Sequence, residues 1–180
     1  MKYVPSLAMW FCMGFAAASH APNLTPGQGW DAFVGTWEIV GVVSDAEEQV
    51  KTAIYKATEE MNFLTRGIAR DRLINSQKPP KQIRMRRQNE MFTIHPDTIS
   101  ALSMPISGKA VKYEDRMAWV SLDTGGGRLA LRQISENRQG KRENVYRLQD
   151  SGKSLILEVT VSSSSLPAQL KYTLKFTRVK

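Results

Sequence analysis

Few residues in this chain could carry out covalent or metal chemistry. The sequence has one cysteine, Cys12, and two histidines, His20 and His95. A cysteine–histidine pair or a histidine-rich metal site therefore has almost nothing to be built from. His95 precedes Pro96 at the end of a strand-like segment, which is a commonplace turn position. We expect no catalytic residue, no metal and no cofactor.

The triple glycine at residues 125–127 could suggest a phosphate-binding loop. It lies between two strand-like segments and introduces no helix, whereas phosphate loops open onto a helix N-terminus. We therefore interpret it as a hairpin turn.

Composition and charge describe an ordinary globular protein. The chain has 180 residues, 42% hydrophobic and 23% charged, and a formal net charge of +8. This mixture excludes a disordered or fibrous chain, and the length suits one domain. The positive charge favours anionic partners but says nothing of the fold. No aromatic-basic RNA-binding motif accompanies it, so we do not expect nucleic-acid binding.

The first 18 residues have the three parts of a secretory signal. Lys2 supplies the positive start, residues 3–15 are mostly apolar, and residues 16–18 are small alanines. We expect residues 1–18 to be removed from a secreted protein, or a periplasmic one in a bacterium. Cys12 would leave with them, so no disulfide would staple the mature chain. Residues 19–32, rich in proline and glycine, read as a loose lead-in.

A helical insert is predicted at residues 44–78. Ser44 and Glu47 have capping-box spacing, and apolar residues recur at steps of three and four through Ile68. Gly67 marks a possible break between two helices. Two prolines at residues 79–80 end the helical region, because proline cannot continue a helix interior.

The rest of the chain reads as short strands separated by turns. Alternating or β-branched stretches predict ten strands, at residues 35–43, 82–87, 91–95, 99–106, 110–115, 117–123, 128–136, 143–149, 154–162 and 169–179. Such a series indicates an all-β, ten-stranded antiparallel up-and-down β-barrel over residues 33–180, with the insert acting as a lid between the first two strands. Closure would remove the exposed sheet edges.

The stretch DAFVGTWEIV at residues 31–40 resembles the start of the fatty-acid-binding-protein family, within the calycin group that includes lipocalins. DSGKSLIL at residues 150–157 is similar to the turn and ninth strand of that family. The resemblance implies binding of a small hydrophobic ligand, such as a fatty acid, by a monomeric barrel. The insert is longer than the compact lid usual in the family.

The resemblance also implies a head-group site, which this chain would retain only in part. Family members hold a carboxylate with an arginine on the eighth strand and an arginine–tyrosine pair on the tenth. Counting back from the turn at residues 150–152 puts Arg147 at the first position, while Leu174 and Phe176 take the other two. Arg147 is either a ligand anchor or part of a structural ion pair with Glu143 or Glu158.

Other positions follow from the same resemblance. An arginine near the chain end, here Arg178, is expected to pack over Trp37 and close the barrel base. A ligand cavity would be lined by Met85, Phe92, Trp119, Tyr172, Leu174 and Phe176. The alternative is a barrel filled by its own side chains, as small barrels often are.

We therefore expect an exported, non-enzymatic barrel that binds a hydrophobic molecule or lipid without covalent chemistry. The alternative is a secreted β-barrel that acts as a protein-interaction or inhibitor module without a lipid. Basic residues cluster around the end of the insert, which allows transient contact with an anionic membrane surface or simply a solvated face. They are Arg66, Arg70, Arg72, Lys78, Lys81, Arg84, Arg86 and Arg87.

Overall fold

A computed structural model describes residues 28–125 and 129–179 of the chain. The signal expected at residues 1–18 lies outside the described residues. The described chain forms one ten-stranded antiparallel sheet in the order β4-β3-β2-β1-β10-β9-β8-β7-β6-β5. The strands are β1 (Gly35–Ile39), β2 (Gln82–Gln88), β3 (Met91–Pro96), β4 (Leu102–Pro105), β5 (Val111–Tyr113), β6 (Arg116–Asp123), β7 (Ala130–Asn137), β8 (Gly140–Gln149), β9 (Ser154–Ser163) and β10 (Leu170–Arg178).

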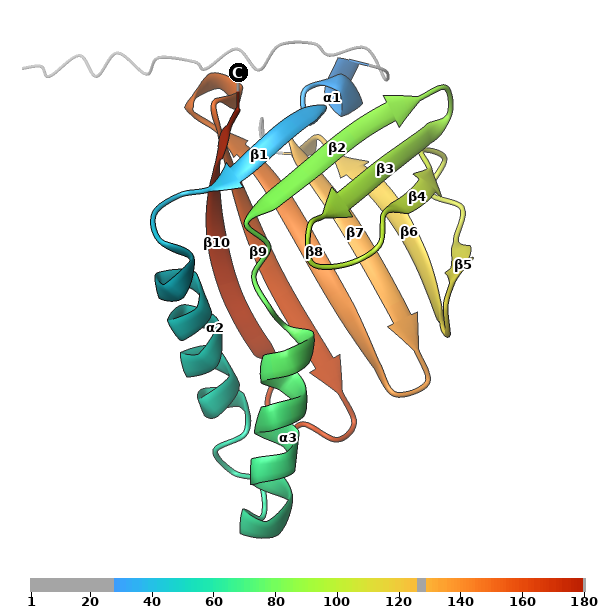
Figure 1. Ribbon diagram of the computed structural model, residues 1–180. Coiled ribbons are helices and arrows are strands. Elements are labelled where there is room, and N and C mark those ends of the chain that lie inside the picture. The colour runs from blue at the N-terminus through green and yellow to red at the C-terminus, as the bar shows by residue number, and fades with distance from the viewer. Residues whose placement is uncertain (1–27, 126–128, 180) are drawn as a thin grey trace, which may run out of the picture.

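The sheet curls into a nearly closed barrel (Figure 1). Its two outermost strands are β4 and β5, which lie beside one another without being neighbours in the hydrogen-bonded order. All strands that are consecutive in the chain, apart from β4 and β5, pair in antiparallel ladders. β1 also pairs with β10, so it joins β2 to β10. The predicted fold class is confirmed.

The alternating side chains of each strand decide which of them face the interior. In β10 the residues from Leu170 to Phe176 alternate strictly between buried and exposed. A short 3-10 turn at Asp150–Gly152 joins β8 to β9. Gly152 has φ +83°, a conformation that favours glycine and permits the tight turn.

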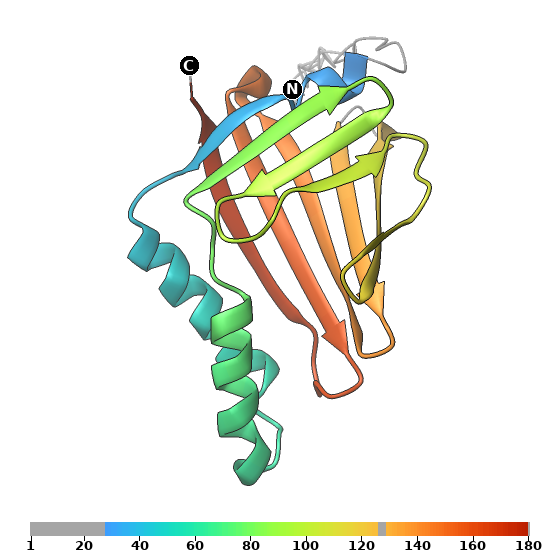
Figure 2. The ribbon, with the colours of Figure 1, turned by 45° about the vertical axis from the view of Figure 1, so that its right-hand side comes forward.

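Two helices, α2 (Val43–Ala57) and α3 (Phe63–Ser76), connect β1 to β2. They extend beyond the strand ends on one side of the barrel (Figure 2). α2 packs on β10 through Ala46, Val50, Ile54 and Ala57. α3 buries none of its residues. Among the described residues, no helix is both long and apolar enough to cross a membrane.

Two details of the helical prediction are wrong. The helices are separated by residues 58–62, and Gly67 lies inside α3. Asn62 caps α3, because its side chain accepts a hydrogen bond from the Leu64 backbone N–H at 2.9 Å. α2 begins at Val43 after Val42, with no side-chain cap, so the capping box at Ser44 does not form.

One end of the barrel is closed by an aromatic plug. The Arg178 guanidinium lies 4.3 Å from the centroid of the Trp37 ring, and the indole N–H donates to the Phe33 carbonyl at 3.0 Å. Both aromatic side chains are fully buried. The guanidinium also donates to three main-chain carbonyls, those of Ala32, Val34 and Gly152.

The lead-in is more ordered than its composition predicts. Its described part forms a short helix, α1 (Gln28–Asp31), at the plugged end. Trp30 is buried there, with its ring centroid 5.3 Å from that of Phe92. Asp31 forms an ion pair with Arg87 of β2 at 3.3 Å. α1 therefore contacts the barrel through Trp30 and Asp31.

Candidate functional site

A group of hydrogen-bonded polar side chains lies on the inner face of the barrel. It combines residues from β7, β8 and β10 with one residue that directly follows α3. We call it the interior polar cluster; its members are Gln77, Gln133, Arg142, Asn144, Tyr146 and Tyr172.

Strand register explains why these side chains share one face. In the β7–β8 ladder Gln133 lies opposite Asn144, and Leu131 lies opposite Tyr146. Arg142 and Asn144 are two residues apart, so their side chains point to the same side as that of Tyr146. In the β8–β9 ladder, Tyr146 lies opposite the buried Leu157, which identifies this side as the interior.

Arg142 is the centre of the cluster. Its Nη1 donates to Gln77 Oε1 at 2.6 Å, its Nε to Asn144 Oδ1 at 3.0 Å, and its Nη2 to the Tyr172 hydroxyl at 3.3 Å. The Tyr172 hydroxyl in turn donates to Gln77 Oε1 at 3.3 Å. The guanidinium is half-buried, while Gln77, Asn144 and Tyr172 are buried.

A second layer of the cluster holds the first in place. Gln133 Oε1 accepts from Asn144 Nδ2 at 2.9 Å and from the Tyr146 hydroxyl at 3.2 Å. Burial raises the pKa of the Tyr146 phenol, so it stays a neutral donor. Within the described residues, every buried side-chain nitrogen and oxygen has a hydrogen-bond partner. The second layer is thus a satisfied structural support.

The cluster contains a cation without a carboxylate. Among the described residues, none of the ion pairs includes Arg142. The nearest acid in sequence, Glu143, points to the outer face, where it pairs with Arg132 and Lys141. A half-buried guanidinium with only neutral partners is suited to bind an anion, since charge-assisted hydrogen bonds are stronger than neutral ones.

The cluster lies toward the end of the barrel opposite the aromatic plug. Arg142 is near the β8 residue Gly140, which pairs with Ser163, whereas the plugged end lies beside Gly152. Between these ends Leu157 and Leu174 are buried beside Tyr146, whereas the buried Val159 and Leu170 lie level with Asn144 and Arg142. The polar cluster thus lies beside apolar walls of β9 and β10, and the interior on its plug side is apolar.

Five of the expected lining residues are buried in the barrel. They are Met85, Phe92, Tyr172, Leu174 and Phe176, and all belong to one hydrophobic core cluster. Of these five, only Tyr172 also forms hydrogen bonds in the interior polar cluster.

Arg147 and Trp119 do not point inward as expected. Arg147 lies on the outer face opposite Ile156 and forms an ion pair with Glu158, at 3.3 Å. Of the two roles considered for Arg147, this contact favours the structural ion pair over the ligand anchor. Trp119 alternates with the buried Ala118 and Val120, so its partly exposed ring faces outward. Both corrections follow from strand parity.

The sequence prediction missed Arg142, Gln77 and Asn144, and it included Tyr172 only as a cavity-lining residue. The count from the turn at Asp150–Gly152 selected an odd-numbered position of β8, whereas its inward residues are even-numbered. One signal was available, because Tyr146 and Leu148 are the large apolar side chains of that strand and share parity with Arg142. Strand parity gives no such signal for Gln77, because this residue follows a helix and belongs to no strand.

A surface pocket lies away from the interior polar cluster. A pocket of about 380 Å³ is lined by Glu38, Ile39, Lys81, Gln82 and Asp97, around the start of β2. In the described part of the chain, no three histidine, cysteine or acidic side chains are placed to hold a metal ion.

Comparison with known proteins finds similar solved structures but no similar sequence. No protein-family model matches the chain, and no curated protein matches it. Solved structures do match. A secretory abundant heat soluble (SAHS) protein from Ramazzottius varieornatus has a TM-score of 0.48 and 10% identity, over 82% of this chain and 96% of that one.

Fatty-acid-binding proteins are also among these structures. Fatty-acid-binding protein 1 of Echinococcus granulosus has a TM-score of 0.48 and 12% identity, over 83% of this chain and 99% of that one. The fatty acid binding protein of Schistosoma mansoni, solved with arachidonic acid, has a TM-score of 0.47 and 12% identity, over 84% and 99% of the two chains. The family that the opening strand resembles is therefore among the structural neighbours.

Proposed function

We propose that this protein binds a small amphipathic acid, such as a fatty acid, without covalent chemistry. The acidic head group binds Arg142 and Tyr172, and the apolar tail lies along the inner walls of β9 and β10. The single observation that carries the proposal is the inward guanidinium of Arg142, whose partners are all neutral.

The energetics favour selection by the head group. Burial of an acyl tail contributes about 0.8 kcal/mol per methylene before ordering costs, whatever the head group is. A hydrogen bond to a charged group contributes a further ~1.5–3 kcal/mol. A carboxylate that gains two such bonds should therefore bind more tightly than the matching alcohol.

Calorimetric titration with decanoate and decanol tests this proposal. These ligands share a tail and differ in head-group charge. Arg142→Gln should weaken decanoate binding by about tenfold or more and leave decanol binding nearly unchanged. Arg147→Gln is the matched control, because it removes an arginine from the same strand but from its outer face.

Two outcomes would contradict the proposal. Wild-type protein that binds neither ligand saturably, and carries no lipid in native mass spectrometry, would favour a protein-interaction barrel. Equal weakening of decanoate and decanol by Arg142→Gln would make the arginine a structural residue only.

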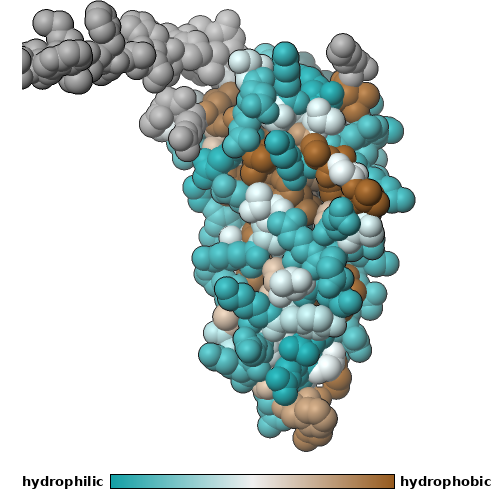
Figure 3. All heavy atoms as spheres, turned by 90° about the vertical axis from the view of Figure 1, so that its left-hand side faces the viewer, coloured by the Kyte–Doolittle hydropathy of each residue, from teal (hydrophilic) through white to brown (hydrophobic). Residues whose placement is uncertain are grey.

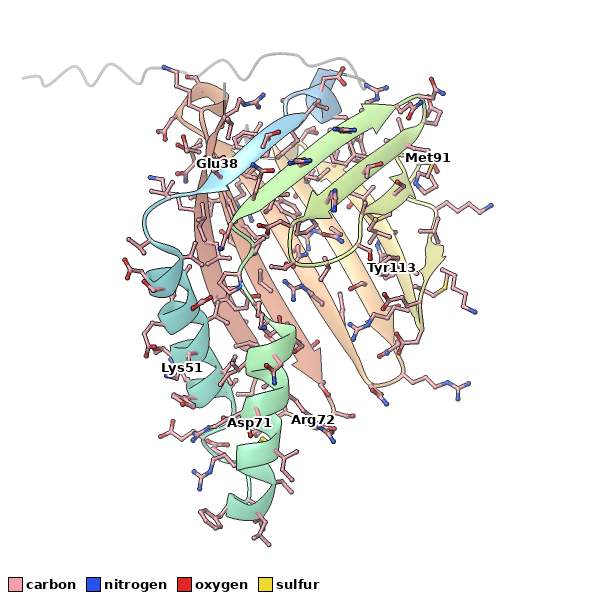
Figure 4. The ribbon with its side chains drawn as sticks, viewed as in Figure 1. Glu38, Lys51, Asp71, Arg72, Met91 and Tyr113 are labelled. Carbon is pink, nitrogen blue, oxygen red and sulfur yellow. The ribbon has the colours of Figure 1, made fainter. Side chains whose placement is uncertain are left out.

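We also propose that the tip of the helical pair contacts membranes during ligand transfer. Phe63, Leu64 and Ile68 are 78%, 76% and 57% exposed. Figure 3 shows apolar surface at the tip that projects farthest from the barrel. Arg72, labelled in Figure 4, lies on the same helix and adds a cation that would favour anionic lipid.

Vesicle co-sedimentation measures this contact. Phe63→Ser should lower binding to phosphatidylcholine vesicles that contain phosphatidylserine by about fivefold, since it removes a large apolar side chain from the tip. Val179→Ser, an exposed apolar position near the plugged end, is the control. Equal effects of the two substitutions would locate the contact elsewhere.

Export is proposed from the N-terminal sequence alone. Lys2, the apolar run at residues 3–15 and the alanines at residues 16–18 support a cleaved signal. Mass determination of the protein recovered outside expressing cells should give a chain that begins near residue 19. Recovery of the full-length chain inside the cells would contradict this part of the proposal.

A further inference from the structure

Gln77 occupies the position that a ligand carboxylate would need. Its Oε1 accepts from Arg142 Nη1 at 2.6 Å and from the Tyr172 hydroxyl at 3.3 Å. These are the two donors that converge on one oxygen inside the barrel. A carboxylate oxygen is an acceptor of similar size in a group that carries a negative charge. The Tyr172 hydroxyl has one hydrogen, so a carboxylate oxygen can accept it only in place of Gln77 Oε1.

Gln77 is also the residue that ends α3. Its backbone N–H donates to the Leu73 carbonyl at 2.8 Å as the C-cap, and its side-chain Nε2 donates to Ser76 Oγ at 3.2 Å. The side chain is 8% exposed, although α3 itself buries no residue. One amide group thus joins the end of a surface helix to the interior cation.

The other polar attachments of α3 lead to α2 and the segment that follows it, and they include the Arg70 guanidinium, 4.4 Å from the centroid of the Tyr55 ring. Arg70 Nε donates to Thr58 Oγ1 at 3.0 Å, and Arg66 Nη1 donates to the Glu59 carbonyl at 3.2 Å, so both bonds reach only the segment that precedes the helix. Leu73 and Ile74 are partly buried against the core. Among the described residues, Gln77 supplies the side-chain hydrogen bonds between the end of α3 and the strands.

We propose that Gln77 is a competitive latch: its amide oxygen holds the head-group site in the empty protein, and an acidic ligand displaces it and frees the end of α3. This inference rests on the proposed function and adds regulation to the same site. The exchange is favourable because a neutral acceptor on Arg142 is replaced by a charged one. Binding of the acid and loosening of the helix end are therefore coupled.

Two substitutions at Gln77 give opposite expectations. Gln77→Ala removes the competing oxygen and should strengthen decanoate binding by about fivefold. Gln77→Glu keeps the shape, gives Arg142 a carboxylate partner and should weaken decanoate binding by about tenfold. Decanol binding should change less than about twofold in both variants, because it carries no charge. Calorimetric titration measures all four constants.

Hydrogen exchange supplies a structural readout. Saturating decanoate should speed amide exchange in the last turn of α3, up to Gln77, while exchange in β9 stays unchanged. In Gln77→Ala this turn should exchange fast without ligand, and decanoate should add nothing further.

The outcomes separate the latch from the underlying function. Wild-type protein that binds decanoate in an Arg142-dependent way, with an unchanged or lower affinity in Gln77→Ala, would overturn the latch alone. Equal gains for decanoate and decanol would also overturn it, because the amide would then block entry rather than compete for the cation. Loss of saturable binding in wild type and both variants would overturn the proposed function itself.

Discussion

At the scale of single residues, two arginines on one strand have opposite environments. Arg142 and Arg147 are five positions apart on β8, and an odd spacing puts them on opposite faces of the sheet. Arg147 meets Glu158 on the outer face, while Arg142 meets only neutral groups inside. Parity, and not residue type, decides which of them can take a ligand.

Arg178 illustrates an arginine with a purely structural position. It stacks on Trp37 and donates to three carbonyls. Arg178→Ala should lower the free energy of unfolding by about 2–3 kcal/mol, since hydrogen bonds from a charged group are lost at a closed end. Lys175→Ala, exposed on the same strand, should stay within about 0.5 kcal/mol. Urea denaturation measures both, and equal small effects would show that the plug does not depend on the arginine.

Tyr146 gives a pH-dependent prediction. Burial raises its pKa above the ordinary value, so the unfolded chain loses this proton at a lower pH than the folded chain does. The associated stability is complete below about pH 10 and is lost as the pH rises further. Stability of Tyr146→Phe should therefore fall less between about pH 9 and 11 than that of the wild type. Parallel curves in urea titrations would contradict this.

At the scale of elements, the two helices differ in how they are held. α2 has a buried stripe against β10, whereas α3 has no fully buried residue, packs through the partly buried Leu73 and Ile74, and ends at Gln77. The helical pair thus joins one fixed helix to one that is held mainly at its end. This arrangement allows α3 to respond to a ligand without unfolding the barrel.

A pair of isoleucines tests this difference. Ile54 of α2 is fully buried and Ile68 of α3 is 57% exposed. Ile54→Ala should lower the free energy of unfolding by about 2–5 kcal/mol, because it leaves a cavity between α2 and β10. Ile68→Ala should change it by no more than about 0.5 kcal/mol. Similar losses from both substitutions would mean that α3 packs more tightly than described.

The sequence predicted the elements better than the site. All ten strands were predicted within a few residues, because period-two alternation and turn residues are local signals. The helix break was misplaced because Gly67 suggested a break and Asn62, the actual cap, was not used. The face of Arg147 depended on a count from one turn, and an error of one residue inverts every side chain. Gln77 joins the site only through the tertiary fold.

At the scale of the whole molecule, the barrel has two unlike ends. The end at Trp37 and Arg178 is plugged by buried aromatic side chains and covered by α1. Arg142 and the helical pair lie toward the opposite end. The interior polar cluster and the end of α3, which we propose is released by the ligand, are therefore on the same side of the barrel. In the proposed function, ligand selection and entry are separated from the part that closes the barrel.

The most direct test of the central claim is nuclear magnetic resonance of decanoate labelled with a heavy carbon isotope at its carboxyl group. When decanoate is bound to wild type or Arg147→Gln, its carboxyl group should stay ionised to a lower pH than in free decanoate, because an adjacent cation lowers the pKa of a carboxyl group. The chemical shift of the labelled carbon reports this ionisation. Bound Arg142→Gln should lose this shift. A bound signal that titrates as the free acid does, in all three proteins, would contradict head-group binding at Arg142.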